Sequence, residues 1–245
     1  MKRPLVRAIS AHVRERVVVN FAVDPELMAE ELPCEWLAPQ VINGKGVASF
    51  CVLWLDRLTP SGWPPGLIAS QICCAVRFGV IDRTTGRPGV YVVDRCTDSA
   101  LGSFATRLGF PGFHPLVKVS EREVSSSRQI TVEREGAPYV SFALGDAHGS
   151  CGVFGDAQEF SRFMAEGDRS YTLAARSGVV NVVDLVKEET EFVPYEVSQV
   201  DAHGLPKPIQ MPCTADSAFR AADARYEWQF VEQRPLLVSV GVVAT

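Results

Sequence analysis

The chain has 245 residues, of which 47% are hydrophobic and 22% are charged, and its formal net charge is −5 at pH 7. This composition is typical of a globular protein and excludes disordered and fibrous classes. The negative charge balance gives no basic footprint for nucleic acid, and no apolar run reaches the length of a membrane span.

The first third of the chain alternates strand signals with one helix. Residues 14–23 are rich in β-branched and aromatic side chains and predict a strand. Asp24 then serves as an N-cap and Pro25 as the first residue of a helix that Pro33 ends. Further strands are predicted over residues 47–55, 72–81 and 89–93.

A second helix is predicted to begin near Asp98 and Ser99, because Leu101, Phe104, Ala105 and Leu108 form an apolar stripe. Strands over residues 129–133 and 139–144 follow. A third helix has Asp156 as its N-cap and ends at Gly167. The remaining segments are predicted strands over 179–186, 191–200, 226–232 and 236–243, and a weaker helix over 215–224.

Many strands joined by short turns favour an antiparallel sheet that is closed or sandwiched, so we expect a mainly β protein of the α+β type. No linker or repeat divides residues 1–245, which we interpret as one domain.

Sequence features that the chain lacks predict its cellular compartment and the classes of partner that it does not bind. Residues 1–13 have no apolar segment of the kind a secretory signal needs. Seven cysteines without regular spacing favour free thiols in a reducing compartment. His148 and Cys151 lie close in sequence, but His203 and Cys213 do not form the second tight pair of a zinc site. We expect a cytoplasmic protein with no metal, no cofactor, no nucleic acid and no membrane partner.

Residues 108–120 carry the first candidates for chemistry. If Pro115 does not break the strand, alternation places His114 and Lys118 on one face. In a pocket, desolvation would lower the pKa of Lys118 and free its amine as a nucleophile, whereas the alternative is an exposed lysine on a half-buried strand. His114 either contacts a ligand or belongs to the turn. Arg107 either binds a carboxylate or lies at the surface.

Several strings, taken in order, resemble the YqjF-like family, an uncharacterised bacterial branch of the acetoacetate decarboxylase-like superfamily. They are the strand that runs into Asp24-Pro25-Glu26-Leu27, the string Gly89-Val90-Tyr91, the string Thr97-Asp98-Ser99, and the turn Phe110-Pro111-Gly112-Phe113-His114. The resemblance implies a curved antiparallel β-barrel or cone with a few short flanking helices, an internal ligand cavity and a homo-oligomer.

In the decarboxylase a lysine of lowered pKa at this turn forms a Schiff base with the substrate. Here Gly112 and Phe113 stand where the paired lysines are expected, and Lys118 is the nearest lysine. Ala22 lies where the family pattern leads us to expect an arginine, and Ala69-Ser70-Gln71 replaces the glutamate expected near residues 69–71. We therefore expect the scaffold to be shared and acetoacetate decarboxylation to be absent.

Three functions remain open at this point. The first is an enzyme acting on a keto acid or other carbonyl compound, with Lys118 as the imine-forming amine, His114 as acid or base, and Arg107 or Gln71 orienting the substrate. The second is a non-catalytic barrel that binds an apolar small molecule, and the third is a protein of oligomeric assembly. The ligand-binding candidates are Arg107, Gln71, Phe110, Phe113 and Tyr91.

Overall fold

The computed structural model describes residues 6–64, 68–105, 114–174, 178–210 and 214–237. Its strands are β1 (Ala8–Val23), β2 (Leu37–Pro39), β3 (Val41–Ile42), β4 (Lys45–Pro60), β5 (Ile68–Asp82), β6 (Arg87–Thr97), β7 (Lys118–Val124), β8 (Ser127–Arg134), β9 (Ala137–Ala147), β10 (Arg169–Leu173), β11 (Val179–Lys187), β12 (Val193–Asp201) and β13 (Ser217–Pro235). Its helices are α1 (Pro25–Glu30), α2 (Ala100–Ala105), the 3₁₀ helix η2 (Gly152–Phe154), α3 (Ala157–Glu166) and α4 (Lys207–Gln210).

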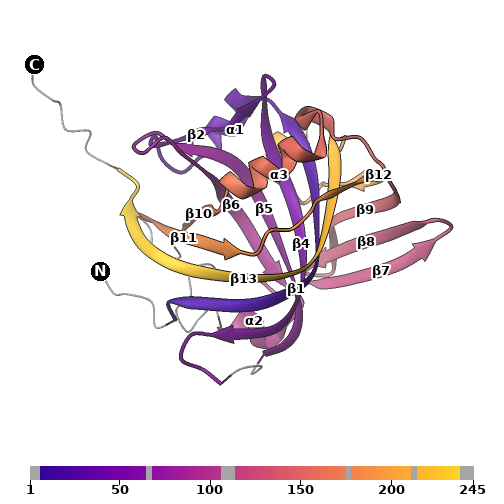
Figure 1. Cartoon of the computed structure of the whole chain (residues 1–245), viewed down its shortest axis with the longest axis horizontal. Helices are drawn as coiled ribbons and strands as arrows, with labels where there is room; N and C mark the ends of the chain where they lie inside the picture. Colours follow the sequence, from indigo (N-terminus) through magenta and orange to yellow (C-terminus); the bar gives the residue numbers. More distant parts are fainter. Residues whose placement is uncertain (1–5, 65–67, 106–113, 175–177, 211–213, 238–245) are drawn as a thin grey trace, which may run out of the picture.

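Seven of these strands close into a barrel, which confirms the predicted fold class. Their order is β1-β4-β5-β6-β10-β11-β13, and the ring closes because β1 pairs with both β4 and β13 (Figure 1). The barrel pairings are antiparallel except for a short parallel contact between β6 and β10. Closure leaves the barrel strands without free edges and encloses an interior.

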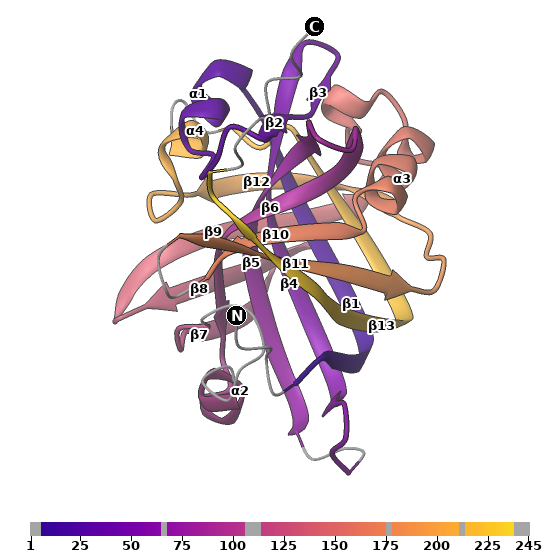
Figure 2. The same ribbon diagram turned by 90° about the vertical axis from the view of Figure 1, so that its left-hand side faces the viewer.

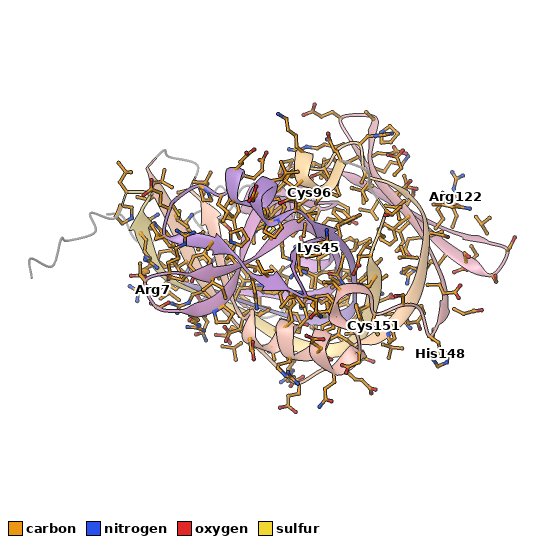
Figure 3. The ribbon with its side chains drawn as sticks, turned by 90° about the horizontal axis from the view of Figure 1, so that it is seen from above. Arg7, Lys45, Cys96, Arg122, His148 and Cys151 are labelled. Atoms are coloured by element: carbon orange, nitrogen blue, oxygen red, sulfur yellow. The ribbon has the colours of Figure 1, made fainter. Side chains whose placement is uncertain are left out.

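The same sheet continues beyond the barrel and covers part of the barrel wall. β13 also pairs with β12, and β12 continues through β9 and β8 to β7. The hairpin of β7 and β8, which carries Arg122, projects from the barrel (Figure 3). The main hydrophobic core lies between the barrel wall and this continuation of the sheet, and it includes Val17, Phe50, Ile130 and Phe142. Because both faces of β1 and β4 are buried, these strands read as nearly continuous apolar runs.

Helix α3 lies across one end of the barrel (Figures 1 and 2). The Asp156 carboxylate accepts a hydrogen bond from the Glu159 N–H at 2.7 Å, which confirms the predicted N-cap. Phe160 is fully buried and stacks on Phe219 of β13, with 3.8 Å between ring centroids. A Cβ atom on Gly79 would come within 2.9 Å of the Phe163 ring, so a glycine at this position lets α3 pack closely on β5.

The C-terminal prediction of a helix over residues 215–224 is wrong, because these residues begin β13. Their alanines favour a helix in isolation, but Ala218 and Ala221 are buried and pair with β1. The inward alternation also changes phase near Asp223, whose φ is 50°, and this hides the strand period. The predicted strand over 236–243 lies outside the described residues beyond position 237, and residues 236 and 237 are not in a strand.

Among the helices in the described part of the chain, none is long and apolar enough to cross a membrane.

Candidate active site inside the barrel

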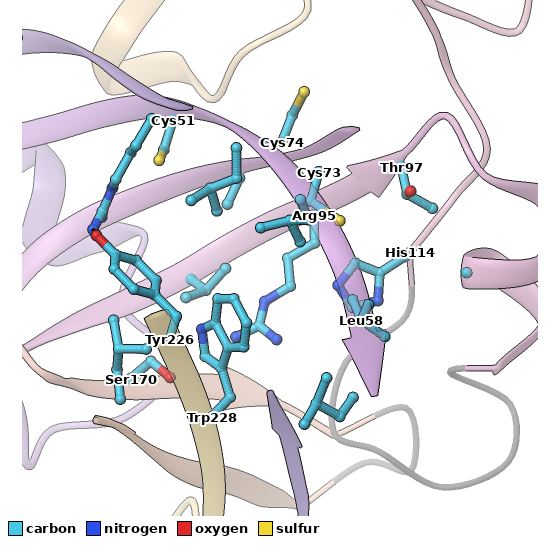
Figure 4. A pocket seen from close by; sticks show the side chains of 18 of the residues that line it. Cys51, Leu58, Cys73, Cys74, Arg95, Thr97, His114, Ser170, Tyr226 and Trp228 are labelled. Atoms are coloured by element: carbon cyan, nitrogen blue, oxygen red, sulfur yellow. The ribbon is translucent and has the colours of Figure 1, made fainter. Parts of the chain in front are cut away.

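A cavity of about 400 Å³ occupies the interior of the barrel (Figure 4). All seven barrel strands contribute side chains to its wall. Four of these residues are basic, and their charges set the character of the cavity: Arg16 of β1, Arg77 of β5, Arg95 of β6 and Lys187 of β11.

Strand alternation explains how charged residues enter a β-barrel without disrupting its outer core. On β5, Gln71, Cys73, Ala75 and Arg77 are two residues apart and all line the cavity. The intervening Val76 and the following Phe78 belong to the main core outside the barrel. Both faces of β5 are therefore buried, one against apolar side chains and the other against the cavity.

Arg16 is 2% exposed, and it is the largest fully buried side chain in the described structure. Its Nη1 donates a hydrogen bond to the Tyr226 hydroxyl at 3.1 Å. The guanidinium lies 5.7 Å from the Tyr226 ring centroid and 5.8 Å from that of Phe192, at cation–π distance. Its Nε is buried and has no hydrogen-bond partner.

Arg77, like Arg16, has a buried guanidinium nitrogen without a hydrogen-bond partner. Its Nε is buried without a partner, and burial lowers the pKa of its guanidinium to about 10. No described carboxylate forms an ion pair with Arg16 or Arg77. Asp168, an acid that lines the cavity, is paired with Arg87 at 2.8 Å. Since an unpaired buried charge is costly, these two guanidiniums are suited to an anionic ligand.

Arg95 lies between the two halves of the cavity, opposite Ala75 in the β5–β6 register. Its Nη2 donates to the Thr172 hydroxyl at 3.0 Å, and burial lowers its pKa to about 10. Figure 4 shows Arg95, His114 and Trp228 extending into the cavity from three different segments.

Lys187 is the lysine that lines the cavity within the described residues. Burial, together with the charges of Arg16 and Arg77, lowers the pKa of its amine to about 7. The amine donates a hydrogen bond to the Met164 carbonyl at the end of α3. A substantial fraction of the amine is therefore uncharged at neutral pH, and the uncharged form of a lysine amine is the nucleophilic one.

Two neutral groups face the cavity closer to α2. Gln71 is 8% exposed and its Nε2 lies 3.2 Å from the Cys73 sulfur, while its Oε1 has no partner. Gly102 makes room for that oxygen, since a Cβ there would lie 2.1 Å from it. Burial, and next the charge of Arg95, lowers the pKa of His114 to about 3, so the ring is neutral; its Nδ1 is buried and unpaired.

Some of the site residues predicted from the sequence line the cavity, and others do not. His114 and Gln71 line the cavity, as their predicted roles require. Lys118 does not: its side chain is 72% exposed and its amine lies 3.3 Å from Glu133 on β8. The expected alternation exists, but Val117 takes the buried position, and Pro115 separates His114 from the strand. Tyr91 does not line the cavity either, because its ring packs against Phe78 in the outer core.

Arg107, Phe110 and Phe113 lie outside the described residues. The cavity thiols Cys51 and Cys73 are free, and burial raises the pKa of Cys73 to about 12, which keeps that thiol protonated. Over the part of the chain that the structure describes, no group of three or more His, Cys, Asp or Glu residues could hold a metal ion.

Sequence reasoning missed Arg16, Arg77, Arg95 and Lys187. The available signal was a basic residue inside two predicted strands, Arg16 in 14–23 and Arg77 in 72–81; Arg95 and Lys187 lie just beyond the predicted strands over 89–93 and 179–186. A charge within an apolar strand is expected to face water, a partner or a ligand.

Comparison with solved structures places the fold. The chain is similar to an acetoacetate decarboxylase from Legionella pneumophila, with a TM-score of 0.68 and 12% identity over 95% of this chain and 90% of the other. It is also similar to an acetoacetate decarboxylase-like enzyme from Sphingomonas wittichii (TM-score 0.59, 11% identity, 96% and 94% covered). A third similar structure is the enduracididine biosynthesis enzyme MppR complexed with pyruvate (TM-score 0.55, 13% identity, 97% and 92% covered).

At these identities the likeness shows a shared fold alone. No curated protein matches the chain. Residues 10–205 match the family DUF2071, whose description reads "Uncharacterized conserved protein (COG2071)". The match spans most of the chain, and it agrees with the resemblance drawn from the strings around Asp24 and Asp98. The chain thus belongs to the DUF2071 family, with an acetoacetate decarboxylase-like fold.

Proposed function

We propose that this protein binds a small organic acid bearing a carbonyl group inside its barrel and reacts with it through the amine of Lys187. The observation that carries the proposal is that Arg16, Arg77 and Lys187 all line one cavity in the barrel interior. Two guanidiniums without carboxylate partners supply the charge that a carboxylate needs, and the adjacent amine supplies a nucleophile. The complex of MppR with pyruvate gives this ligand class a precedent in the same fold.

The reaction begins with attack of the Lys187 Nζ lone pair on the carbonyl carbon. Both amine protons then leave with the carbonyl oxygen as water, and a carbon–nitrogen double bond remains. Once protonated, this imine withdraws electrons from a bond at the adjacent carbon, so that a 2-oxo acid loses a proton from that carbon to the released water, whereas a 3-oxo acid loses carbon dioxide from it. Arg16 and Arg77 hold the carboxylate during this sequence.

His114 and Gln71 have a different part in this proposal. A pKa of about 3 leaves His114 neutral at physiological pH, so we assign it a hydrogen bond to the ligand rather than storage of a proton. The unpaired Gln71 oxygen accepts a hydrogen bond from a ligand hydroxyl or amine.

Reductive trapping tests the reaction. We expect borohydride, which reduces an imine to a stable amine, to fix one pyruvate per chain, and peptide mass spectrometry to place it on Lys187. The variant Lys187→Met should form no adduct, whereas Lys118→Met should form it normally. An adduct on Lys118, or no adduct with any of several 2-oxo acids, would contradict the proposed chemistry.

A second function remains a candidate, because leucines and Trp228 make up much of the cavity wall. The barrel would then carry an apolar ligand without converting it. This alternative predicts thermal stabilisation by ligand, no imine on Lys187, and unchanged binding in Lys187→Met.

A further inference from the structure

The barrel cavity is chemically polarised along its length, and this is visible in the strand register. On β4, Val47 and Cys51 belong to the cluster around α3, whereas Leu55 and Leu58 belong to a separate apolar cluster. β5 runs antiparallel to β4, so Arg77 lies level with Ser49 near α3. Gln71 lies level with Leu55 towards the other end.

The end near α3 carries the positive charge. Lys187 is held there by its hydrogen bond to the Met164 carbonyl, and the charges of Arg16 and Arg77 both act on its amine. Both guanidiniums have a buried Nε without a partner. This end is therefore built for the carboxylate and carbonyl of a ligand.

The opposite end is largely apolar, and the guanidinium of Arg95 lies between it and the end near α3. Its wall contains Leu55 and Leu58 of β4 and Trp228 of β13. The rim is formed by Trp63, which is 43% exposed, and by Leu101 of α2, which is 52% exposed. The polar groups on this side, Gln71 and His114, are uncharged. A second carboxylate carried to this end would face leucine and tryptophan side chains.

We propose that the ligand is a monoanionic 2-oxo acid with an apolar chain, whose head lies at Arg16, Arg77 and Lys187 and whose chain extends past Leu55 and Leu58 towards Leu101. This inference rests on the proposed binding of an organic acid, and it adds the ligand class. Because binding removes the apolar surface of the ligand's alkyl chain from water, each added methylene should strengthen binding about two- to fourfold until this alkyl chain reaches the rim of the cavity.

Calorimetric titration of a homologous series tests the proposal. Pyruvate, 2-oxobutanoate, 2-oxopentanoate, 2-oxohexanoate and 2-oxodecanoate are titrated into the protein and into its Lys187→Met variant, in which imine formation cannot contribute. We expect affinity to rise along the series in both proteins. We also expect 2-oxodecanedioate, whose second carboxylate would lie beyond Arg95 among the apolar side chains, to bind at least tenfold more weakly than 2-oxodecanoate.

A matched pair of leucine variants tests where the alkyl chain of the ligand lies in the cavity. Leu101→Asn should reduce the gain from 2-oxohexanoate to 2-oxodecanoate, whose chain is long enough to reach this residue, severalfold. Leu27→Asn, at a leucine of similar exposure on α1 that does not line the cavity, should not change it. Affinity that is independent of chain length, equal effects of the two variants, tighter binding of the dicarboxylate, or no binding by the series would each overturn the inference.

The two proposals fail separately. If pyruvate is trapped on Lys187 but chain length has no effect, the proposed reaction stands and the apolar-chain inference falls. If affinity rises with chain length but borohydride traps nothing, the ligand class stands and the imine chemistry falls.

Discussion

Replacing Arg77 by methionine should make the ligand-free protein more stable. Burial lowers the pKa of Arg77 from 12.5 to about 10, and at about 1.36 kcal/mol per pKa unit this corresponds to a cost of about 3.4 kcal/mol for the charged form. The side chain is partly open to the cavity, where solvent reduces that cost. Since no described carboxylate pairs with Arg77, methionine should raise the free energy of unfolding by about 1–3 kcal/mol.

The direction of this stability change follows from the linkage between proton binding and folding. At pH 7 Arg77 is protonated in both the folded and the unfolded chain, so the whole penalty is present, and it disappears only as the pH rises above about 10. Urea or thermal unfolding at pH 7 measures the effect, with about 2–4 °C expected per kcal/mol for a chain of this size. Arg162→Met, at an exposed residue of α3, is the matched control and should change stability little.

The same Arg77→Met variant should bind 2-oxopentanoate much more weakly, so the ligand should stabilise it less than it stabilises the wild type. Stabilisation of the free protein with loss of binding is the signature of a charge kept for a ligand. If Arg77→Met instead destabilises the free protein by more than about 1 kcal/mol, the charge has a structural partner and the reasoning about the cavity is wrong.

Three further predictions concern the same cavity and the helix above it. Lys187 is neutral in the folded chain and protonated in the unfolded chain between pH 7 and 10.5, so stability should rise with pH in this window by at most about 1.4 kcal/mol per unit, and Lys187→Met should lack this rise in pH-dependent unfolding. His114 binds its proton only in the unfolded chain between pH 3 and 6.5, so stability should fall as the pH drops below 6.5; a His114→Gln variant with the same acid profile would refute this. Phe160→Ala removes a fully buried ring that stacks on Phe219 and should cost about 3–5 kcal/mol in chemical unfolding, whereas a loss below 1 kcal/mol would mean that α3 is not part of the core.

Local signals predicted most of the scaffold. The caps at Asp24 and Asp156 are short-range hydrogen bonds, and the structure contains both. The strand-rich pattern predicted an antiparallel sheet that is closed or sandwiched, and the family resemblance predicted a barrel, which the structure confirms. The alanine-rich start of β13 was misassigned because its pairing with β1, about 200 residues away, decides its conformation.

The cavity was harder to predict because both faces of its strands are buried. On β5, the run from Val76 to Phe78 does not reveal which face meets the cavity, so Arg77 could not be assigned from periodicity. Lys118 is the lysine nearest in sequence to the predicted turn, but the neighbouring Val117 takes the buried position, so the Lys118 side chain faces solvent outside the cavity. Lys187 is far from that turn in sequence and meets Arg16 only through closure of the barrel.

A crystal structure of the protein after borohydride reduction in the presence of 2-oxopentanoate tests the central claim most directly. We predict a covalent bond from the ligand to Lys187 Nζ, the carboxylate within hydrogen-bond distance of Arg16 or Arg77, and the propyl chain directed towards Leu58. An empty barrel, or a ligand bound to Lys118 at the surface, would contradict the account.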